Sequence, residues 1–428
     1  MSPPARRLAR CARLSVFALA LVEPVARVAR AADPLNTSDR AAASAPQPAR
    51  GDTQLNIVPV VGGTTDIGAG VGEFAGITRV RKGHDPYVWN LESAGLVTFK
   101  LGNANRLLVP YQDIYLKLTV PRIFGAASEL QIMPEYTTET TLGYYGIGNA
   151  STATPPPGMS SSYFWYSRTH PTLPVELRWR LVDHLIGVAG VRYTQNWMTV
   201  PAGSKLAVDQ SSGSAEVRSF LGPTAPHGVA TFTYGLRWDD RDSNVSPHTG
   251  SFHDGLVRLS PGGTTAFPYR YGETTVDSQV FVPLARRLTL ALRAVGDLLF
   301  GDPPIYALPR VGEDFALGGP NGVRGIPTQR YAGKVKVFGT TELRADVVSF
   351  HALGKPMRFG LVGFFDGGRV WADVTPHPDL DGHGIGLKYG VGGGVRLQSG
   401  TAFVLRGDLA WSPDAQPIGA YFAAGQSF

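Results

Sequence analysis

Apolar and polar residues alternate with a period of two along most of the chain from residue 53 onward. In the run 334–347, apolar or small residues occupy one face, and Lys336, Glu342 and Arg344 occupy the other. The runs 385–398 and 402–411 repeat this alternation. A period of two predicts β-strands that have one apolar and one polar face.

The pattern predicts sixteen strands joined by connections of two kinds. The predicted strands are 55–62, 66–77, 89–102, 111–121, 128–138, 162–181, 185–198, 228–239, 250–261, 269–283, 286–300, 334–348, 356–371, 385–398, 401–411 and 418–428. Most are longer than the strands of a soluble sandwich, which would also show alternation because one face is solvated. The long connections, at 139–161, 199–227, 301–333 and 372–384, all follow odd-numbered strands. This arrangement is typical of a bilayer-spanning barrel with long loops outside the cell and both ends in the periplasm.

We therefore expect an all-β fold over residues 53–428, a transmembrane antiparallel barrel of 16 strands that encloses an aqueous lumen. Composition agrees with this fold, because only 17% of the 428 residues are charged while Gly and Pro number 52 and 33. Beyond the first thirty residues no apolar stretch is long enough for a spanning helix. The content of aromatic residues, 10%, argues against a disordered chain.

The N-terminus has the features of an export signal. Four arginines precede the apolar run 14–22, and Ala29-Arg30-Ala31 follows it, as in a secretory signal peptide covering residues 1–31. An uncleaved anchor is the alternative, and cleavage after Ala31 is the expectation. Residues 32–52, rich in Ala, Pro and Ser, are expected to form a flexible periplasmic linker. Export and a barrel fold together predict an outer-membrane location of the Gram-negative type.

Charge and reactive residues exclude several function classes. Residues 1–31 hold six arginines and one glutamate, so they account for five of the six net positive charges. The remaining chain is nearly neutral, which argues against nucleic-acid binding. The single cysteine, Cys11, lies within the expected signal peptide, so no disulfide is expected.

Catalytic motifs are also missing from the sequence. It contains no Gly-x-Ser-x-Gly elbow, no His-Glu-x-x-His motif and no phosphate-binding loop. The nine histidines are scattered through the chain. We therefore predict a protein that is not an enzyme, with no catalytic residue, metal or cofactor.

Two motifs in the C-terminal third carry more information. The connection 301–333 contains Val323-Arg324-Gly325 within a glycine-rich stretch, and the strand 356–371 carries Phe364-Phe365-Asp366-Gly367-Gly368. In these motifs the chain resembles the C-terminal barrel of the outer-membrane assembly and translocation superfamily, the bacterial surface antigen or BamA/TamA-like proteins. The resemblance implies that the loop tip folds back into the lumen. It also implies that Arg324 meets an acidic residue in a wall motif formed by Phe364, Asp366 and Gly368.

Further matches extend the resemblance over roughly residues 53–428. They are Tyr144-Tyr145-Gly146-Ile147-Gly148-Asn149, Asp240-Arg241-Asp242 and a terminal aromatic residue, Phe428. The resemblance implies that Phe422 and Phe428, on the lipid face of the last strand, form a C-terminal targeting signal. It also implies periplasmic POTRA domains, for which residues 32–52 are too short.

The residues themselves support a site for the loop tip. Strand alternation places Asp366 and Glu342 on the lumen side, where either carboxylate could hold Arg324 through charge-assisted hydrogen bonds. The alternative is that all three only line a wet lumen, as Arg396 and Asp408 are expected to do.

Two functions remain open from the sequence. The first is insertion or translocation of proteins at the outer membrane. Its candidate partners are an unfolded or secreted protein as cargo, the surrounding membrane lipid and a separate periplasmic protein. A weak seam between strands 55–62 and 418–428 would suit this function, since glycines at 62, 63, 419 and 425 weaken strand pairing. The alternative is a passive channel or structural barrel without insertase activity, in which these glycines are kinks that let the barrel close.

Overall fold

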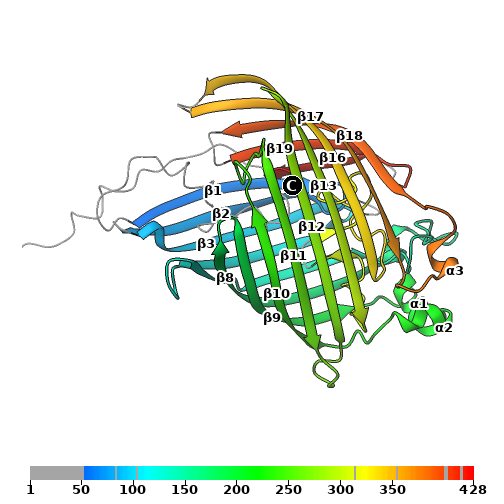
Figure 1. The fold of residues 1–428 in the computed structure, drawn as a ribbon. Helices are drawn as coiled ribbons and strands as arrows, with labels where there is room; N and C mark the ends of the chain where they lie inside the picture. The colour runs from blue at the N-terminus through cyan, green and yellow to red at the C-terminus, as the bar shows by residue number, and fades with distance from the viewer. Residues whose placement is uncertain are drawn as a thin grey trace, which may run out of the picture.

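The computed structural model describes residues 53–81, 84–102, 105–312, 315–352, 355–399, 403–414 and 418–428. The predicted signal peptide and linker, residues 1–31 and 32–52, lie outside the described residues. The described chain forms a closed antiparallel β-barrel, shown in Figure 1, and the prediction of 16 strands is confirmed.

The wall is built from strands in chain order. They are β1 (Thr53–Thr64), β2 (Gly68–Arg81), β3 (His84–Leu101), β5 (Tyr111–Pro121), β6 (Ser128–Ile132) with β7 (Glu135–Gly143), β8 (Trp165–Val182), β9 (Leu185–Thr199), β10 (His227–Asp239), β11 (Gly250–Pro261), β12 (Arg270–Ala285), β13 (Leu288–Gly301), β16 (Val335–Ala352), β17 (Lys355–Trp371), β18 (Lys388–Ser399), β19 (Phe403–Trp411) and β20 (Gly419–Ala424). Three short strands lie outside this sequence of wall strands: β4 (Leu107–Leu108), β14 (Arg310–Val311) and β15 (Phe315–Ala316). The short helices are η4 (Ser161–Phe164), α1 (Lys205–Ser212), α2 (Ala215–Ser219) and α3 (Pro378–Asp381).

One wall strand is interrupted in the middle. We expected a single strand at 128–138, but β6 and β7 are separated by Met133 and Pro134. Proline has no amide hydrogen to donate to a neighbouring strand, so the ladder breaks there and resumes at Glu135. The resumed strand continues to Gly143, which is further than predicted.

The two faces of the wall differ as the alternation predicted. Apolar side chains on the outer face are exposed, among them Val276, Val337, Leu343, Leu361 and Phe365. Charged side chains on the inner face are buried, among them Arg293, Asp297, Lys336, Glu342 and Asp366. An apolar outside and a polar inside are the arrangement that a bilayer demands of a barrel. No helix within the described ranges is long and apolar enough to cross a membrane.

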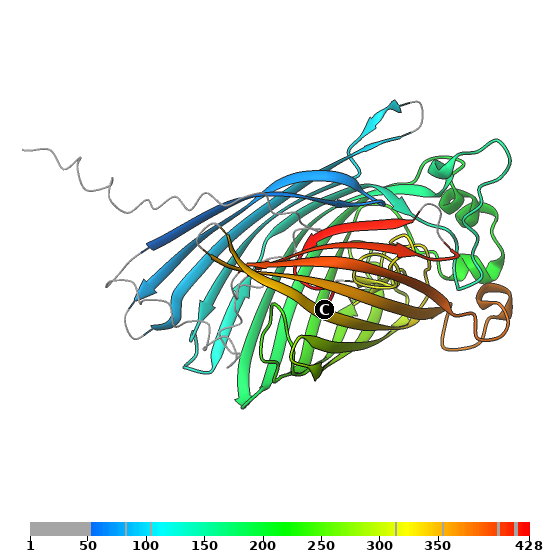
Figure 2. The same cartoon turned by 90° about the horizontal axis from the view of Figure 1, so that it is seen from above.

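The long connections close one end of the barrel. Helices α1, α2 and α3 lie together at this end in Figures 1 and 2, which the long loops identify as the outer end. A buried apolar cluster joins the loops and the strand ends, with members Leu142, Tyr144, Ile147, Tyr166, Leu206, Phe220, Leu299, Ile305, Tyr306, Leu308, Ala332 and Ala372. Main-chain bonds also link the loops, from Gly148 N–H to the Ala332 carbonyl oxygen (2.7 Å) and from Ala150 N–H to that of Leu380 (2.9 Å).

The barrel closes through a short seam between its first and last strands. β1 pairs with β2 along its whole length, but with β20 only at Gly63 and Thr64. One further bond runs from Thr65 N–H to the Ala420 carbonyl oxygen, 3.2 Å. Within the described residues, the rest of β1 has no partner strand on the seam side. Pro59 lies in this unpaired stretch, a position suited to proline because no amide is needed there.

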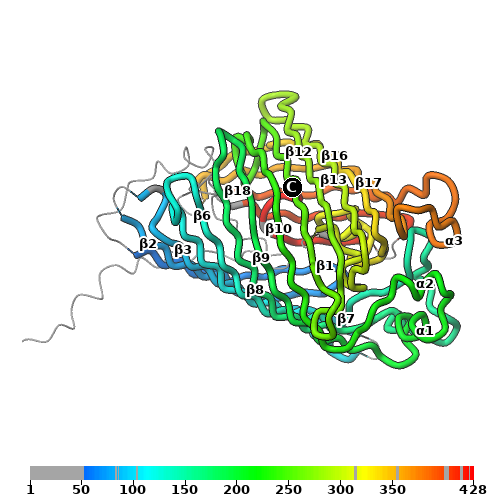
Figure 3. The backbone as a smooth tube through the Cα atoms, turned by 60° about the horizontal axis from the view of Figure 1, so that its bottom comes forward, coloured from blue at the N-terminus to red at the C-terminus, as the bar shows by residue number. Residues whose placement is uncertain are grey.

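The end of the chain departs from the prediction. We expected the last strand to run over 418–428 with Phe422 and Phe428 both facing lipid. Phe422 is exposed on the outer face, but β20 ends at Ala424, and Gly425 takes a positive φ of 88°. The C-terminal end then lies over the barrel interior in every view, as Figure 3 also shows.

The aromatic ring of Phe428 is therefore inside the barrel. Its centroid is 6.0 Å from that of Phe281, and the Arg344 guanidinium carbon is 4.8 Å from the Phe428 ring centroid. Both partners are buried on the inner face. The expectation of a lipid-facing Phe428 was wrong, because the turn at Gly425 lets the lumen supply partners that strand alternation does not reveal.

Candidate functional site

The connection between β13 and β16, residues 302–334, enters the lumen and packs against the wall. Figure 2 shows it in yellow within the outline of the barrel. A second apolar cluster holds it against β13, β16 and β17, with members Val295, Val311, Leu317, Val323, Ile326, Tyr331, Phe338 and Val370. Val323 is fully buried in this cluster, and its N–H donates to the Leu317 carbonyl oxygen at 2.6 Å. The body of the loop is thus a packed element.

Arg324 lies at the loop tip and meets carboxylates from three strands. Its Nε and Nη2 donate to the two oxygens of Asp366 at 2.8 and 2.9 Å, and its main-chain N–H donates to Asp366 Oδ2 at 3.0 Å. Its Nη1 donates to Glu342 Oε1 at 2.7 Å and to Asp408 Oδ2 at 3.3 Å. The Arg324 side chain is 1% exposed and the three carboxylates are 0% exposed. We call these four residues the arginine cluster.

The wall motif contributes shape as well as charge. The Arg324 guanidinium carbon is 3.4 Å from the ring centroid of Phe364, so the aromatic face covers the cation. At Gly368, an added Cβ would come within 2.8 Å of Leu317 Cδ1 and 2.7 Å of Phe338 Cβ. Only glycine leaves room there for the loop to pack against β17.

Other cations balance the remaining charge of the arginine cluster. Arg344 Nε donates to Glu342 Oε2 at 2.8 Å, and Arg396 forms an ion pair with Asp408. Burial lowers the pKa of the Arg324 guanidinium, but Asp366 and Glu342 raise it by more, so the pKa lies above its usual range. Arg324 therefore stays charged although it is buried.

The C-terminal residues join the same cluster from the opposite side. Ser427 Oγ donates to Glu342 Oε1 at 2.6 Å, the oxygen that also accepts from Arg324. Arg396 Nε donates to Gln426 Oε1 at 2.8 Å, and Arg344 Nη2 donates to the Phe428 main-chain oxygen at 3.1 Å. The loop tip and the chain end therefore share one carboxylate.

The structure brings together the residues predicted for the loop tip and the wall: Val323, Arg324, Gly325, Glu342, Phe364, Asp366 and Gly368. It separates the two expected targeting residues, placing Phe422 outside and Phe428 inside. Asp408, expected only to line the lumen, instead binds Arg324 directly. Its place on the polar face of the run 402–411 was the available signal, but alternation cannot show which loop a lumen residue meets.

The tip also touches the last strands through its main chain. Gly325, at a positive φ of 91°, donates its N–H to Tyr421 Oη at 2.8 Å. A Cβ added at Gly390 of β18 would overlap the Arg324 carbonyl oxygen. Neither Tyr421 nor Gly390 could be identified from the sequence. A tyrosine or a glycine in a strand does not indicate which loop residue it will contact.

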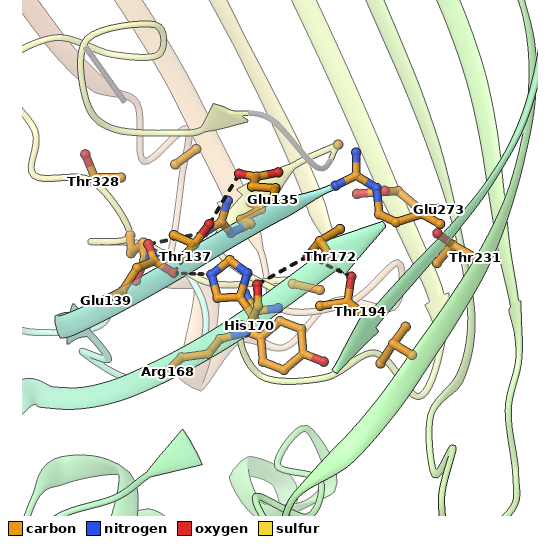
Figure 4. A pocket seen from close by; sticks show the side chains of 18 of the residues that line it. Glu135, Thr137, Glu139, Arg168, His170, Thr172, Thr194, Thr231, Glu273 and Thr328 are labelled. Atoms are coloured by element: carbon orange, nitrogen blue, oxygen red, sulfur yellow. Dashed lines mark hydrogen bonds and ion pairs between the residues drawn. The ribbon is translucent and has the colours of Figure 1, made fainter. Parts of the chain in front are cut away.

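A cavity of about 260 Å³ remains between the loop and the wall formed by β5 to β12. In Figure 4, Glu139 and His170 point toward each other there, and His170 Nε2 is 3.1 Å from Glu139 Oε2. Thr172 and Thr194 lie beside them with their hydroxyl oxygens 3.2 Å apart. Across the described residues, no three His, Cys, Asp or Glu side chains are arranged to hold a metal ion.

The chain is similar to a known protein family and to solved barrel structures. The model of the Omp85 superfamily domain matches residues 185–428. Among solved structures, the chain is similar to BamA from Haemophilus ducreyi lacking POTRA domains 1–3, with a TM-score of 0.57 and 16% identity over 88% of this chain and 70% of that one. It is similar to CdiB from Escherichia coli, with a TM-score of 0.55 and 11% identity over 87% of this chain and 62% of that one. At these identities the likeness concerns the fold, and no curated protein sequence matches the chain.

Proposed function

The chain belongs to the Omp85 superfamily, and from this premise we propose that its barrel acts in the insertion or translocation of proteins at the outer membrane. As a sixteen-stranded barrel of this family, it is an outer-membrane protein of the Gram-negative type. The proposal concerns what the barrel does there. Its cargo would be an unfolded or secreted protein, and a separate periplasmic partner would deliver that cargo.

The short seam is the observation that carries the proposal. β1 exposes main-chain groups along the stretch that β20 leaves unpaired, and Leu55 and Ile57 on this strand are also exposed. An unpaired strand edge is a template for another strand, so a cargo chain can add to β1 by main-chain hydrogen bonds. A passive channel or structural barrel does not require an unpaired strand edge.

A passive channel fits the same structure less well. Residues 302–334 and the chain end occupy the lumen, and the apolar cluster of the outer loops lies across the outer end. A channel for solutes needs a continuous polar path, which these segments obstruct. The lumen is therefore better suited to holding the wall together than to conduction.

Locking the seam tests the proposed function. Thr64 and Tyr421 are register partners across the seam, and the described residues contain no cysteine, so Thr64→Cys with Tyr421→Cys introduces a single disulfide. The variant is reconstituted in liposomes, and insertion of an unfolded outer-membrane barrel protein is followed by its protection from protease. We expect insertion with the reduced variant and a loss of at least tenfold on oxidation.

The reduced and oxidised forms share one sequence, so each controls for the other. Equal insertion by both forms would reject seam opening as the mechanism. If neither the reduced variant nor the unmodified protein accelerates insertion over empty liposomes, the insertase proposal itself fails.

A further inference from the structure

A five-residue segment of the lumen loop binds both sides of the seam. We call residues 324–328 the seam strap. Gly325 N–H donates to Tyr421 Oη on β20 at 2.8 Å. Three residues later, Thr328 donates from its N–H and from Oγ1 to Asp66 Oδ2 at 2.7 and 2.8 Å. Asp66 lies in the turn between β1 and β2, so the strap bonds to strands on opposite sides of the seam.

The strap is fixed on one side of the seam. Arg324 is bound to β16, β17 and β19 through its three carboxylates. Main-chain bonds stiffen the tip, including one from Gly319 N–H to the Ile326 carbonyl oxygen at 2.8 Å. Ile326 is fully buried in the apolar cluster of the loop. The strap is thus a rigid extension of the wall formed by the last strands.

On the other side of the seam the strap has a single point of attachment. Among the hydrogen bonds of the described residues, those from Thr328 to Asp66 are the ones that join the strap to the β1–β2 hairpin. The direct pairing of β1 with β20 is confined to Gly63 and Thr64, next to this turn. The two bonds to Asp66 thus lie next to a seam that has only two register pairs and one further main-chain bond, from Thr65 N–H to the Ala420 carbonyl oxygen.

We propose that the seam strap holds the barrel closed at its outer end, and that the Asp66–Thr328 contact is its release point. Breaking this contact frees the β1–β2 hairpin from the loop, while Arg324 keeps the loop attached to the last strands. The seam then loosens by displacement of β1 away from a fixed β20. The inference is separate from the proposed function, because it concerns the closure of this barrel and not its action on another chain.

Hydrogen exchange of the folded, detergent-solubilised protein tests the strap. We compare Asp66→Ala, which removes the acceptor, with Asp66→Asn, whose side-chain oxygen can still accept from Thr328 N–H. The matched control is Asp183→Ala, which removes an exposed carboxylate from the turn between β8 and β9, away from the seam. Amides in 60–65 and 419–424 report on the seam, and amides in 335–371 report on the anchored wall.

For Asp66→Ala we expect at least tenfold faster exchange at the seam and unchanged exchange in the anchored wall. Asp66→Asn should show an intermediate effect, and Asp183→Ala none. Unchanged exchange at the seam in Asp66→Ala would overturn the proposal. Equal acceleration in 335–371 would also overturn it, because Asp66 would then support overall stability.

A milder variant covers the case in which Asp66→Ala does not fold. Thr328→Val keeps the main-chain bond and the side-chain shape but removes the hydroxyl bond of 2.8 Å. It should raise exchange in 60–65 about threefold, with heat-modifiability on gels confirming that the barrel is folded. Seam exchange equal to that of the unmodified protein would again contradict the strap.

Discussion

Arg324 illustrates how strongly burial changes the meaning of a charged residue in a barrel. A wet lumen would screen its interactions with Asp366 and Glu342, and neutralising one partner would matter little. Instead all of these groups are shielded from solvent by the loop, the wall and the chain end. Removing the guanidinium would leave three buried carboxylates without their shared cation.

We predict that Arg324→Ala lowers the free energy of unfolding by about 3–5 kcal/mol, the range for breaking a buried ion pair. The loop should also be released, because its tip loses the bonds to β16, β17 and β19. The loss of stability is measured as a lower temperature at which the folded, fast-migrating form disappears on gels. The release of the loop is measured as faster protease cleavage within 302–334.

A double-mutant cycle with Asp366→Ala separates this effect from general destabilisation. We expect the two substitutions to be non-additive, because they remove the same interaction. Arg237→Ala is the matched control, since Arg237 is also buried and pairs with Asp254 at 2.8 Å on another part of the wall. Additive effects of Arg324→Ala and Asp366→Ala on nicking would contradict an anchored loop.

Phe428 has two proposed roles that one substitution can separate. As part of a targeting signal, it would matter only in the cell. As a ring packed against Phe281 and Arg344, it would also matter in the purified protein. We predict that Phe428→Ala, refolded in detergent without any assembly factor, unfolds with a free energy about 1–2 kcal/mol lower, less than for a fully buried aromatic side chain because Phe428 is only half-buried.

Cellular levels complete this comparison. Reduced outer-membrane levels of Phe428→Ala with normal stability after refolding would support targeting alone. Phe422→Ala is the companion variant, since Phe422 is 48% exposed on the outer face and should affect stability in detergent much less.

At this scale the sequence predicted the partners of Arg324 only in part. Glu342 and Asp366 could be found because alternation gives their face and the loop motif points to an acid. Asp408 could not, because its contact depends on how far the loop reaches. Nor could Ser427, which binds Glu342 and not Arg324, because its position depends on where the chain turns after Gly425. The direction in which a strand side chain points follows from the local sequence. Which side chains meet across the lumen depends on the shape of the whole barrel.

Among the elements, β18 shows how closely the loop approaches the wall. Gly390 faces the lumen under the Arg324 carbonyl oxygen, where an added methyl group would overlap main-chain atoms. On the adjacent strand β17, a Cβ at Gly363 would meet nothing within 4 Å. Alanine substitutions at these two glycines therefore compare a site where a methyl group clashes with a site where it does not.

We predict that Gly390→Ala costs about 1–3 kcal/mol of stability, as overpacking commonly does, and displaces the loop tip. Gly363→Ala should be neutral or slightly stabilising, since it restricts the unfolded chain. Thermal unfolding of both variants and nicking of 302–334 give the comparison. Equal behaviour of the two would show that the loop does not rest on β18.

The strands themselves were largely predictable, and the exceptions have local causes. Alternation located all the wall strands because every one has a lipid face and a lumen face. To predict the break at Pro134, one would have to know which main-chain amides donate to the neighbouring strand. To predict the early end of β20, one would have to know that the chain turns inward at Gly425, and the alternation of apolar and polar residues does not show this turn.

Across the whole molecule, two packed segments lie within the barrel or at its loop end, and we expect each to limit ion flow. One is the apolar cluster of the outer loops, which includes Leu206 of α1 and Phe220 directly after α2. The other is the lumen loop held by Arg324. Either obstacle alone should limit ion flow.

We predict that replacing residues 204–219 with a short glycine-serine linker leaves conductance in planar bilayers low. Combining this change with Arg324→Ala should raise conductance at least fivefold over either change alone, because both obstacles are then removed. Single-channel recording measures the effect. Large, stable conductance from the linker variant alone would instead favour a passive channel whose lumen loop is no barrier.

The partners of Arg324 have a further consequence for how the chain reaches its final form. The strands that supply its three carboxylates, β16, β17 and β19, all follow the loop in the chain, while Asp66 precedes it by more than two hundred residues. During synthesis Arg324 is made before all three of its carboxylates, whereas Asp66, the partner of Thr328, is made before both. Its surroundings are complete only when β19 is in place. A chain that ends before β19 would lack Asp408 and the C-terminal residues, so it would contain Arg324 without its complete set of buried partners.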